Sequence, residues 1–423
     1  MVRTIAALAL VTAGCFGSLC AAAVSNAAAP ASAKKKKTPP KATAKTAARK
    51  TGSKTATKTA ARTAVKPGTR LSASATRSSA AVGASSFAAR RGTARRAVAR
   101  PDVWKVASFA DSTSGDAVDG EDLIVRRAAV DALGPYNGTI LVSEPHTGRI
   151  LTMVNQKLAL QSGFQPCSTI KVVAALAALN EGIVERTTLL PVARRQSMDL
   201  TDALARSNNP YFSILGTKLG YDKVTRYARQ FGLGEKAGWN VEGEHAGIWP
   251  ETTAKEGVGM MTSFGSAITL TPLQLAALLG AISNGGSLYY LQYPKTAGEI
   301  GGFTPKLKRQ LEIEQLIPEV KPGLMGAVEY GTARRAAYDP NEPILGKTGT
   351  CTDSASPTHL GWFGSFNDTG HNKLVVVVLL TGGKAVNGAV ASQVAGAVYK
   401  NLSIQSFFTP AQAAAARGLS GGQ

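Results

Sequence analysis

Histidine and cysteine are scarce in this chain of 423 residues, which has four of each. The histidines lie at positions 146, 245, 359 and 371 and show no metal-ligand spacing. Chemistry that depends on a bound metal or another cofactor is therefore not expected. Two of the cysteines, Cys15 and Cys20, lie in an apolar N-terminal segment, so Cys167 and Cys351 remain for the rest of the chain.

Charged residues are absent from Ile5–Val24, an apolar run that follows a single base, Arg3. Small residues come next, as they do at signal-peptidase cleavage sites. A run of about 20 apolar residues is also long enough to span a bilayer. Residues 1–33 are thus predicted to be an export signal, either cleaved or kept as a membrane anchor. Lipidation at Cys15 is a weaker alternative, because Thr12 stands where a large aliphatic residue is usual.

Acidic residues are absent from residues 1–100, which nevertheless carry 20 of the 48 basic residues. The other 323 residues carry 28 bases against 27 acids, so the net charge of +21 arises from one segment. Ten Lys and nine Arg with few large apolar residues predict a disordered basic linker over residues 34–100. Its only aromatic residue, Phe87, leaves no platform for stacked bases, which argues against a nucleic-acid partner. A solvated tether is the favoured interpretation, with anionic membrane or envelope polymer as the alternative counter-charge.

About 300 residues remain for a folded core, enough for one large domain. The domain is expected over residues 131–410, after a lead-in segment at 101–130 and before a flexible tail at 411–423. Apolar patterns predict helices over Glu121–Leu133, Cys167–Asn180, Pro272–Ser283 and Ala391–Asn401, and strands over Gly138–Ser143, Ile150–Val154, Trp362–Phe366 and Lys373–Thr381. Strands at both ends with helices between them predict one antiparallel sheet that both ends of the chain complete.

Ser168-Thr169-Ile170-Lys171 is the first of three short motifs that can carry chemistry. A serine and a lysine three residues apart share one face of a helix, so the ammonium can lie beside the hydroxyl. A desolvated lysine can take the proton of the serine and make the serine a nucleophile. The bland alternative is a helix start with a surface lysine. An otherwise apolar helix around the lysine favours the buried role.

The second motif is Ser207-Asn208-Asn209, and the third is Lys347-Thr348-Gly349-Thr350. The second lies between two helical stretches and is, by itself, ordinary turn chemistry. In the third, a lysine beside two hydroxyl groups and a glycine makes a cationic edge that can hold a carboxylate. By itself, the third motif also fits a strand end with a surface lysine.

In this order the three motifs resemble those of the serine β-lactamase and penicillin-binding protein group. The resemblance runs from about Asp131 to Pro410 and includes Leu270–Ala276, Gly331–Ala333 and Gly361–Phe363. It implies an α/β (α+β) fold of the β-lactamase/transpeptidase type. Such a fold has a five-stranded antiparallel sheet flanked by helices and an all-helical subdomain.

The resemblance also implies a serine acyltransferase that acts on the D-Ala-D-Ala stem peptides of peptidoglycan and is inhibited covalently by β-lactam antibiotics. Such an enzyme works in the periplasm or on the outer face of the bacterial cytoplasmic membrane. Ser168 would be the nucleophile and Lys171 its base. Ser207 would pass the proton to the leaving D-Ala.

Substrate binding, on the same resemblance, falls to the second and third motifs. Asn209 would hold the amide of the substrate. The terminal carboxylate would be bound by the third motif, that is, by Lys347, Thr348, Gly349 and Thr350. Backbone N–H groups of Ser168 and Thr350 would form the oxyanion hole.

Cys167 departs from the family pattern, which usually has Gly before the nucleophile, and Cys351 directly follows the third motif. Some class A carbapenem-hydrolysing β-lactamases carry a disulfide at these same two positions. We therefore predict a Cys167–Cys351 disulfide, which suits an oxidising compartment. Two buried free thiols are the alternative.

A β-lactamase is the main alternative function, and it differs in how the acyl-enzyme is hydrolysed. Class A enzymes use a Glu in a Glu-x-x-Leu-Asn context, which does not occur between Asn209 and Lys347. Class D enzymes carry Val where this chain has Asn209. A D,D-transpeptidase or D,D-carboxypeptidase is therefore preferred. A non-catalytic envelope scaffold or sensor is less favoured, since a scaffold is expected to lose one of the three motifs.

Overall fold

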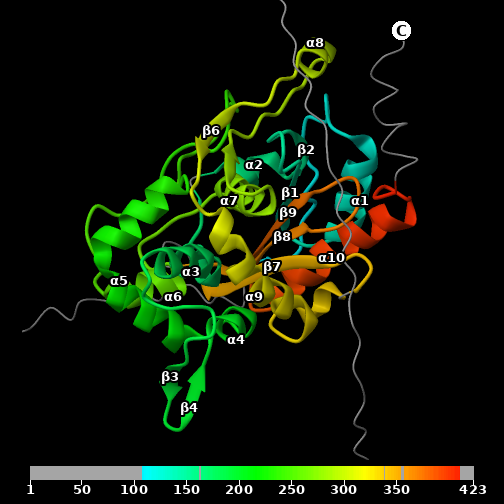
Figure 1. Cartoon of the computed structure of the whole chain (residues 1–423). Coiled ribbons are helices and arrows are strands. Elements are labelled where there is room, and N and C mark those ends of the chain that lie inside the picture. Colours follow the sequence, from blue (N-terminus) through cyan, green and yellow to red (C-terminus); the bar gives the residue numbers. More distant parts are fainter. Residues whose placement is uncertain (1–106, 162, 338, 354–356, 410–423) are drawn as a thin grey trace, which may run out of the picture. The chain divides into compact units, whose positions relative to one another are not determined.

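The computed structural model describes residues 107–161, 163–337, 339–353 and 357–409 (Figure 1). The expected export signal, basic linker and C-terminal tail lie outside these residues. Every helix within the described ranges is too short or too polar to cross a lipid bilayer.

A five-stranded antiparallel sheet, with strand order β2-β1-β9-β8-β7, is the centre of the fold. Its strands are β1 (Gly138–Ser143), β2 (Ile150–Val154), β7 (Ile344–Thr352), β8 (His359–Asn367) and β9 (Val375–Gly382). The N-terminal strand β1 pairs with the late strand β9, as the sequence predicted. The side chains from Val375 to Leu380 are fully buried, because helices cover both faces of the sheet.

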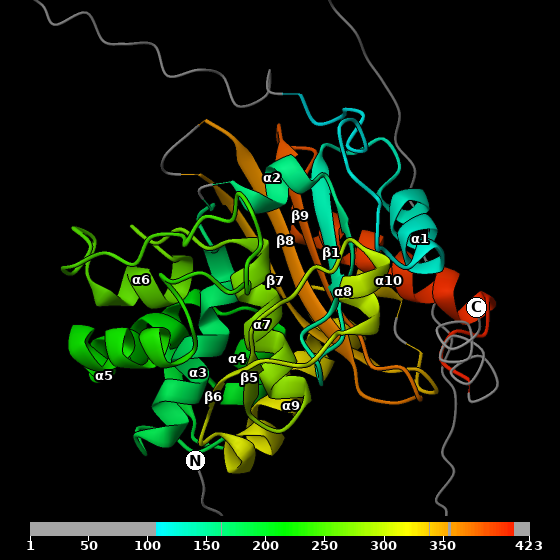
Figure 2. The same ribbon diagram turned by 90° about the horizontal axis from the view of Figure 1, so that it is seen from above.

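Two helices, α1 (Leu123–Leu133) and α10 (Gly388–Ile404), pack together on one face of the sheet (Figure 2). On the other face, α7 (Pro272–Ser283) is buried along its whole length. Thr271 caps α7 and forms a capping box with Gln274, which fixes where the helix begins.

The region beyond α7 is mainly helical. Its larger helices are α3 (Lys171–Asn180), α4 (Leu200–Ala205), α5 (Asn209–Gln230), α6 (Val258–Phe264) and α9 (Ile317–Glu329). Among the smaller elements, α2 (Gln156–Leu160) lies beside β1, and the 3-10 turn η4 (Arg334–Ala336) packs against α10. The others are α8 (Ala297–Gly301), the 3-10 turns η2 (Cys167–Ile170) and η3 (Glu314–Leu316), and the hairpins β3 (Leu190–Ala193)–β4 (Gln196–Met198) and β5 (Ser287–Tyr289)–β6 (Leu307–Gln310). The sequence pattern did not predict these hairpins.

Residues 116–126 of the lead-in segment expected over 101–130 pack against the free edge of β2. The backbone N–H of Asp122 donates to the carbonyl of Leu151 at 2.9 Å. Glu121 is buried, and it accepts hydrogen bonds from the Thr152 hydroxyl and the Met153 N–H at 2.7 and 2.8 Å. Arg126 pairs with Glu121, which keeps the buried charge compensated.

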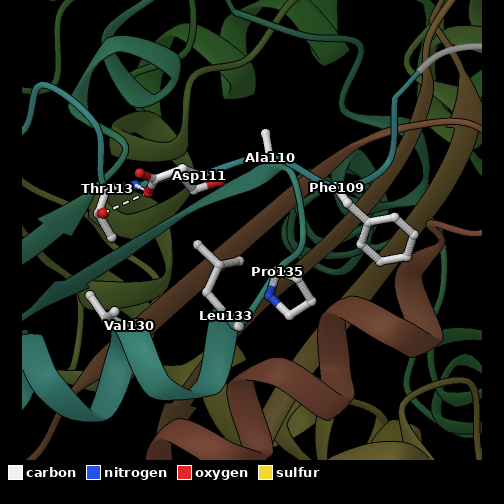
Figure 3. Close-up of a pocket in the computed structure, with 9 residues that line it drawn as sticks. Phe109, Ala110, Asp111, Thr113, Val130, Leu133 and Pro135 are labelled. Atoms are coloured by element: carbon white, nitrogen blue, oxygen red, sulfur yellow. Dashed lines mark hydrogen bonds between the residues drawn. The ribbon is translucent and has the colours of Figure 1, made fainter.

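A surface pocket of about 490 Å³ lies where this segment passes the C-terminal end of α1 (Figure 3). Phe109 and Asp111 border the pocket on one side, and Val130, Leu133 and Pro135 border it on the other. None of the three sequence motifs contributes to this pocket, so the candidate chemistry lies elsewhere.

Candidate active site

Ser168 lies in η2, the 3-10 turn that leads directly into α3. The sequence predicted one helix from Cys167 to Asn180, whereas the first turn is tighter and α3 begins at Lys171. The Thr169 hydroxyl donates to the carbonyl of Pro166 at 2.7 Å and stabilises this turn. Ser168 is 8% exposed, so its hydroxyl is largely withdrawn from solvent.

Lys171 places its ammonium at the centre of the first two motifs. Its Nζ lies 2.9 Å from Ser168 Oγ and 3.1 Å from Ser207 Oγ. The same nitrogen lies 2.8 Å from the carbonyl oxygen of Ser207 and 2.5 Å from Asn209 Oδ1. Ser168 of the first motif and Ser207 and Asn209 of the second motif therefore all contact the same atom, Lys171 Nζ.

The Lys171 side chain is fully buried, and this changes its basicity. Burial disfavours the charged form and, together with the positive charge of Lys347, lowers the pKa of Lys171 to about 6. At neutral pH the amine is thus largely unprotonated, as a proton acceptor for Ser168 must be. The surface-lysine alternative for this motif is wrong.

The second motif connects α4 to α5 through a strained residue. Ser207 has a φ of 56°, in the left-handed region that residues other than glycine rarely adopt. Asn208 then caps α5, and its side chain accepts from the N–H of Tyr211 at 2.8 Å. The cap directs Asn209 and Ser207 toward Lys171.

The third motif lies on β7, the edge strand of the sheet next to η2. Lys347 is 1% exposed in the middle of the strand, so the strand-end alternative is also wrong. Its Nζ donates to the carbonyl of Thr348 at 3.0 Å, and burial lowers the pKa of Lys347 to about 7. The Thr348 hydroxyl shares a hydrogen bond of 2.6 Å with the Thr332 hydroxyl, while Thr350 is exposed.

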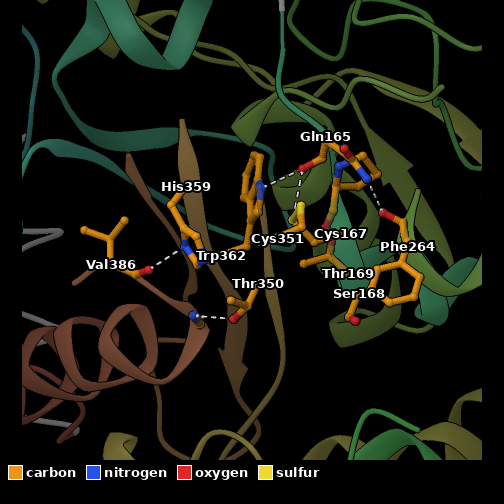
Figure 4. Close-up of a disulfide and its surroundings, with 12 residues drawn as sticks. Gln165, Cys167, Ser168, Thr169, Phe264, Thr350, Cys351, His359, Trp362 and Val386 are labelled. Carbon is orange, nitrogen blue, oxygen red and sulfur yellow. Dashed lines mark hydrogen bonds between the residues drawn. A yellow bond between two sulfur atoms is a disulfide. The ribbon is translucent and has the colours of Figure 1, made fainter. Parts of the chain in front are cut away.

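A disulfide between Cys167 and Cys351 joins η2 to β7 (Figure 4). The prediction of this disulfide from the sequence is confirmed, and the free-thiol alternative is wrong. Cys167 is fully buried and has a φ of 51°, so a non-glycine residue occupies a left-handed conformation directly before Ser168. The covalent bond thereby links the nucleophile turn to the strand that carries Lys347 and Thr350.

Three further residues contact the site without a role assigned from the sequence. The ring of Phe212 lies 5.6 Å from Lys171 Nζ, and Thr332 pairs with Thr348. Gly388, at the start of α10, donates its N–H to Thr350 Oγ1 at 2.8 Å. Thr332 lies in Gly331–Ala333, one of the stretches that carry the family resemblance, and Phe212 follows the second motif by three residues, but Gly388 gives no sequence signal. In the described parts of the chain, no group of His, Cys, Asp or Glu side chains could hold a metal ion.

A helix-flanked antiparallel sheet whose edge strand carries Lys-Thr-Gly-Thr beside a buried Ser–Lys pair defines the class shared by serine β-lactamases and penicillin-binding proteins. Within that class, the chain belongs to the penicillin-binding protein transpeptidase domain family, whose model matches residues 138–402.

Curated relatives include stage V sporulation protein D of Bacillus subtilis, 28% identical over 310 residues, and peptidoglycan D,D-transpeptidase MrdA of Acinetobacter baumannii, 27% identical over 285 residues. The matches cover 64% and 55% of this chain but 48% and 42% of these relatives. The chain thus spans about half the length of the curated relatives it matches.

Two solved structures share the fold. The D,D-transpeptidase domain of a peptidoglycan glycosyltransferase from Eggerthella lenta has a TM-score of 0.55 at 20% identity, covering 68% of this chain and 82% of that one. Pseudomonas aeruginosa PBP2 in complex with WCK 5153 has a TM-score of 0.57 at 23% identity, covering 67% and 77%.

Proposed function

We propose that this protein is a peptidoglycan D,D-transpeptidase that works through an acyl-enzyme on Ser168. The observation that carries the proposal is the position of Lys171 Nζ, 2.9 Å from Ser168 Oγ and 3.1 Å from Ser207 Oγ. A neutral amine at these distances can take a proton from one hydroxyl and exchange it with the other. The family membership and the names of the D,D-transpeptidase relatives support the same function.

In the proposed reaction, Ser168 Oγ attacks the carbonyl carbon of the penultimate D-Ala of a stem peptide, and Lys171 accepts the hydroxyl proton. N–H groups of Ser168 and Thr350 stabilise the oxyanion. The C–N bond to the last D-Ala breaks as Ser207 delivers its proton to the leaving amine and takes the proton held by Lys171, 3.1 Å from Ser207 Oγ. An amine of a second stem peptide then attacks the ester, the C–O bond to Ser168 breaks, and the amine's proton reaches Ser168 Oγ through Lys171.

The substrate is held by the residues around this serine. Asn209 binds the amide of the stem peptide, and its side chain already touches Lys171. Lys347, Thr348 and Thr350 bind the terminal carboxylate along β7, where Gly349 leaves room for η2. A Cβ at Gly349 would come 2.9 Å from the carbonyl oxygen of Pro166, so this position tolerates no side chain without a shift of the nucleophile turn.

We also propose that the chain is exported and works outside the cytoplasm, where peptidoglycan and β-lactams are accessible. Residues 1–100 carry 20 bases and no acid, whereas the rest of the chain has a net charge of only +1. This distribution supports a nearly neutral catalytic unit on a basic tether. The disulfide beside the nucleophile supports an oxidising compartment. Residues 131–410, together with the lead-in segment that packs against β2, then form the catalytic unit, and 34–100 the tether.

The decisive test is the mass of the intact protein during incubation with benzylpenicillin, with Ser168→Ala as the control. We expect an adduct of one penicillin per chain that lasts many minutes on the wild type and never forms on Ser168→Ala. Release of D-Ala from a D-Ala-D-Ala peptide, with transfer of the acyl group to an added D-amino acid, tests the second half of the reaction.

Other outcomes would point to other functions. An adduct that disappears quickly while hydrolysed drug accumulates would identify a β-lactamase. Persistent absence of an adduct would contradict the enzyme assignment and favour a scaffold.

A further inference from the structure

The N-terminal end of α10 contacts the third motif at a position where only glycine fits. The N–H of Gly388 donates to Thr350 Oγ1 at 2.8 Å. A Cβ at Gly388 would lie 2.8 Å from the Gly349 carbonyl oxygen, 2.9 Å from Thr348 Cβ and 3.0 Å from Thr350 Oγ1. The missing side chain thus faces three consecutive residues of the motif.

A second glycine lies on the strand side of the same contact. Gly361 of β8 pairs with Thr350, and a Cβ on Gly361 would come 2.5 Å from the carbonyl oxygen of Asn387. Asn387 caps α10, and its side chain accepts from the N–H groups of Ala389 and Val390. The cap fixes the first turn of the helix, and the two glycines let that turn lie against the motif.

This contact determines how the Thr350 hydroxyl can be used. A hydroxyl oxygen that accepts a hydrogen bond from Gly388 directs its own hydrogen away from Gly388. Thr350 is exposed, so that hydrogen is available to an acceptor arriving at the edge of β7. A carboxylate would form the strongest hydrogen bond with this hydroxyl, because hydrogen bonds to a charged partner are stronger than those between neutral groups.

We propose that Gly388 is a positioning residue for recognition of the substrate carboxylate, acting through the Thr350 hydroxyl and the position of β7. The proposal rests on the proposed function, because it names what orients one of the carboxylate-binding groups. The substrates whose recognition Gly388 affects are therefore acyl donors with a free carboxylate next to the bond that breaks.

The test compares Ser168 acylation of the full chain by benzylpenicillin and by its methyl ester, which lacks the carboxylate. For Gly388→Ala we expect the second-order rate with benzylpenicillin to fall about tenfold or more, with a change of less than about threefold for the ester. Gly396→Ala is the matched control, because its Cβ would meet the carbonyl oxygen of Ala336 at 2.2 Å on the same helix, away from the motif. This control should lower the thermal midpoint and leave the ratio of the two rates unchanged.

A second variant keeps the proposal testable if Gly388→Ala does not fold. Asn387→Ala removes the cap of α10 and should cause a smaller loss that is again selective for the carboxylate. Equal losses for both reagents in the two variants, or no loss in Gly388→Ala, would overturn the proposal. Failure of the proposed function looks different, because the wild type would then form no adduct with either reagent.

Discussion

Lys171 and Lys347 place two amine groups in one buried site, and each has a lowered pKa. The proposed base, Lys171, must be neutral, and its pKa of about 6 sets the acid side of activity. The proposed carboxylate ligand, Lys347, must be charged, and its pKa of about 7 sets the alkaline side. We therefore expect the rate of acylation by benzylpenicillin to rise through about pH 6 and to fall above about pH 7.

Stopped-flow or quenched mass measurements between about pH 5 and about pH 9 would give this profile. The methyl ester of the drug is the control, because it does not need the Lys347 charge and should lose the alkaline fall. A rate with the free acid that keeps rising up to about pH 9 would contradict the proposed role of Lys347.

Thr332 gives a second prediction at the scale of single residues. Its hydroxyl is bonded to that of Thr348 at 2.6 Å, so it orients a proposed carboxylate ligand. Thr332→Val keeps the shape and removes the bond, which is typically worth about 0.5–1.5 kcal/mol. We expect KM for a D-Ala-D-Ala peptide to rise about 2- to 12-fold with little change in kcat. A fall in kcat at unchanged KM would instead place Thr332 in the chemical step.

The residues of the site were predictable because the three motifs occur together and in the order of a known family, although the second and third fit a turn and a strand end when taken singly. Lys171 stands in an apolar helix, and that alone favoured burial. The conformations were not predictable, because φ values of 51° at Cys167 and 56° at Ser207 arise from tertiary contacts. Gly388 was missed since its partner, Thr350, lies on another element 38 residues away.

Among the elements, η2 and β7 are joined by the Cys167–Cys351 disulfide, which closes a loop of 184 residues. Closing so long a loop typically stabilises a fold by about 2–5 kcal/mol. We expect Cys351→Ser to lose stability of this order and to acylate more slowly, because η2 is no longer fixed to the strand. Denaturant unfolding and penicillin acylation, each with and without a dithiol reductant, would measure both effects.

The double variant Cys167→Gly/Cys351→Ser separates the two effects. Glycine adopts a positive φ without strain, so the turn before Ser168 can keep its shape. We expect this variant to recover acylation relative to Cys351→Ser. Its free energy of unfolding should still be lower than that of the wild type, because the disulfide no longer closes the loop. Equal acylation by all three proteins would contradict a positioning role for the disulfide.

Element boundaries were predictable where a cap or a turn marks them. The predicted ends of β1, β2 and α7 agree with the structure, because a hairpin turn and the Thr271 capping box lie in the sequence itself. The strand at Trp362–Phe366 is longer in the structure, reaching from His359 to Asn367. Its extra residues pair with β7, and a pairing partner is not visible from local periodicity.

At the scale of the whole molecule, the lead-in segment is part of the folded unit. Arg126 binds Asp116 at 2.7 Å, and Asp116 accepts from the N–H groups of Asn155 and Gln156 at 2.9 Å. Removing one partner of a buried pair leaves an uncompensated charge, which typically costs about 3–5 kcal/mol. We expect Arg126→Met to lower the free energy of unfolding by this order. Arg127→Met, at an exposed site on the same helix, should have little effect.

The basic segment at residues 34–100 contains 19 Lys and Arg residues and no Asp or Glu. Its charge therefore leads to a prediction about binding to anionic surfaces. Attraction of this segment to an anionic membrane, the alternative to a solvated tether without a partner, depends on total charge alone, at about 1 kcal/mol for each base near the surface. A chain with this segment shuffled should therefore bind anionic vesicles as well as the wild type. A chain with the Lys and Arg of this segment replaced by Gln should not bind, and both altered chains should react with penicillin as the wild type does.

Vesicle co-sedimentation at about 0.05 and about 0.5 M salt would measure the binding, because screening by salt weakens a purely electrostatic contact. Loss of binding on shuffling would show that binding depends on the order of the residues in the segment and not only on their total charge.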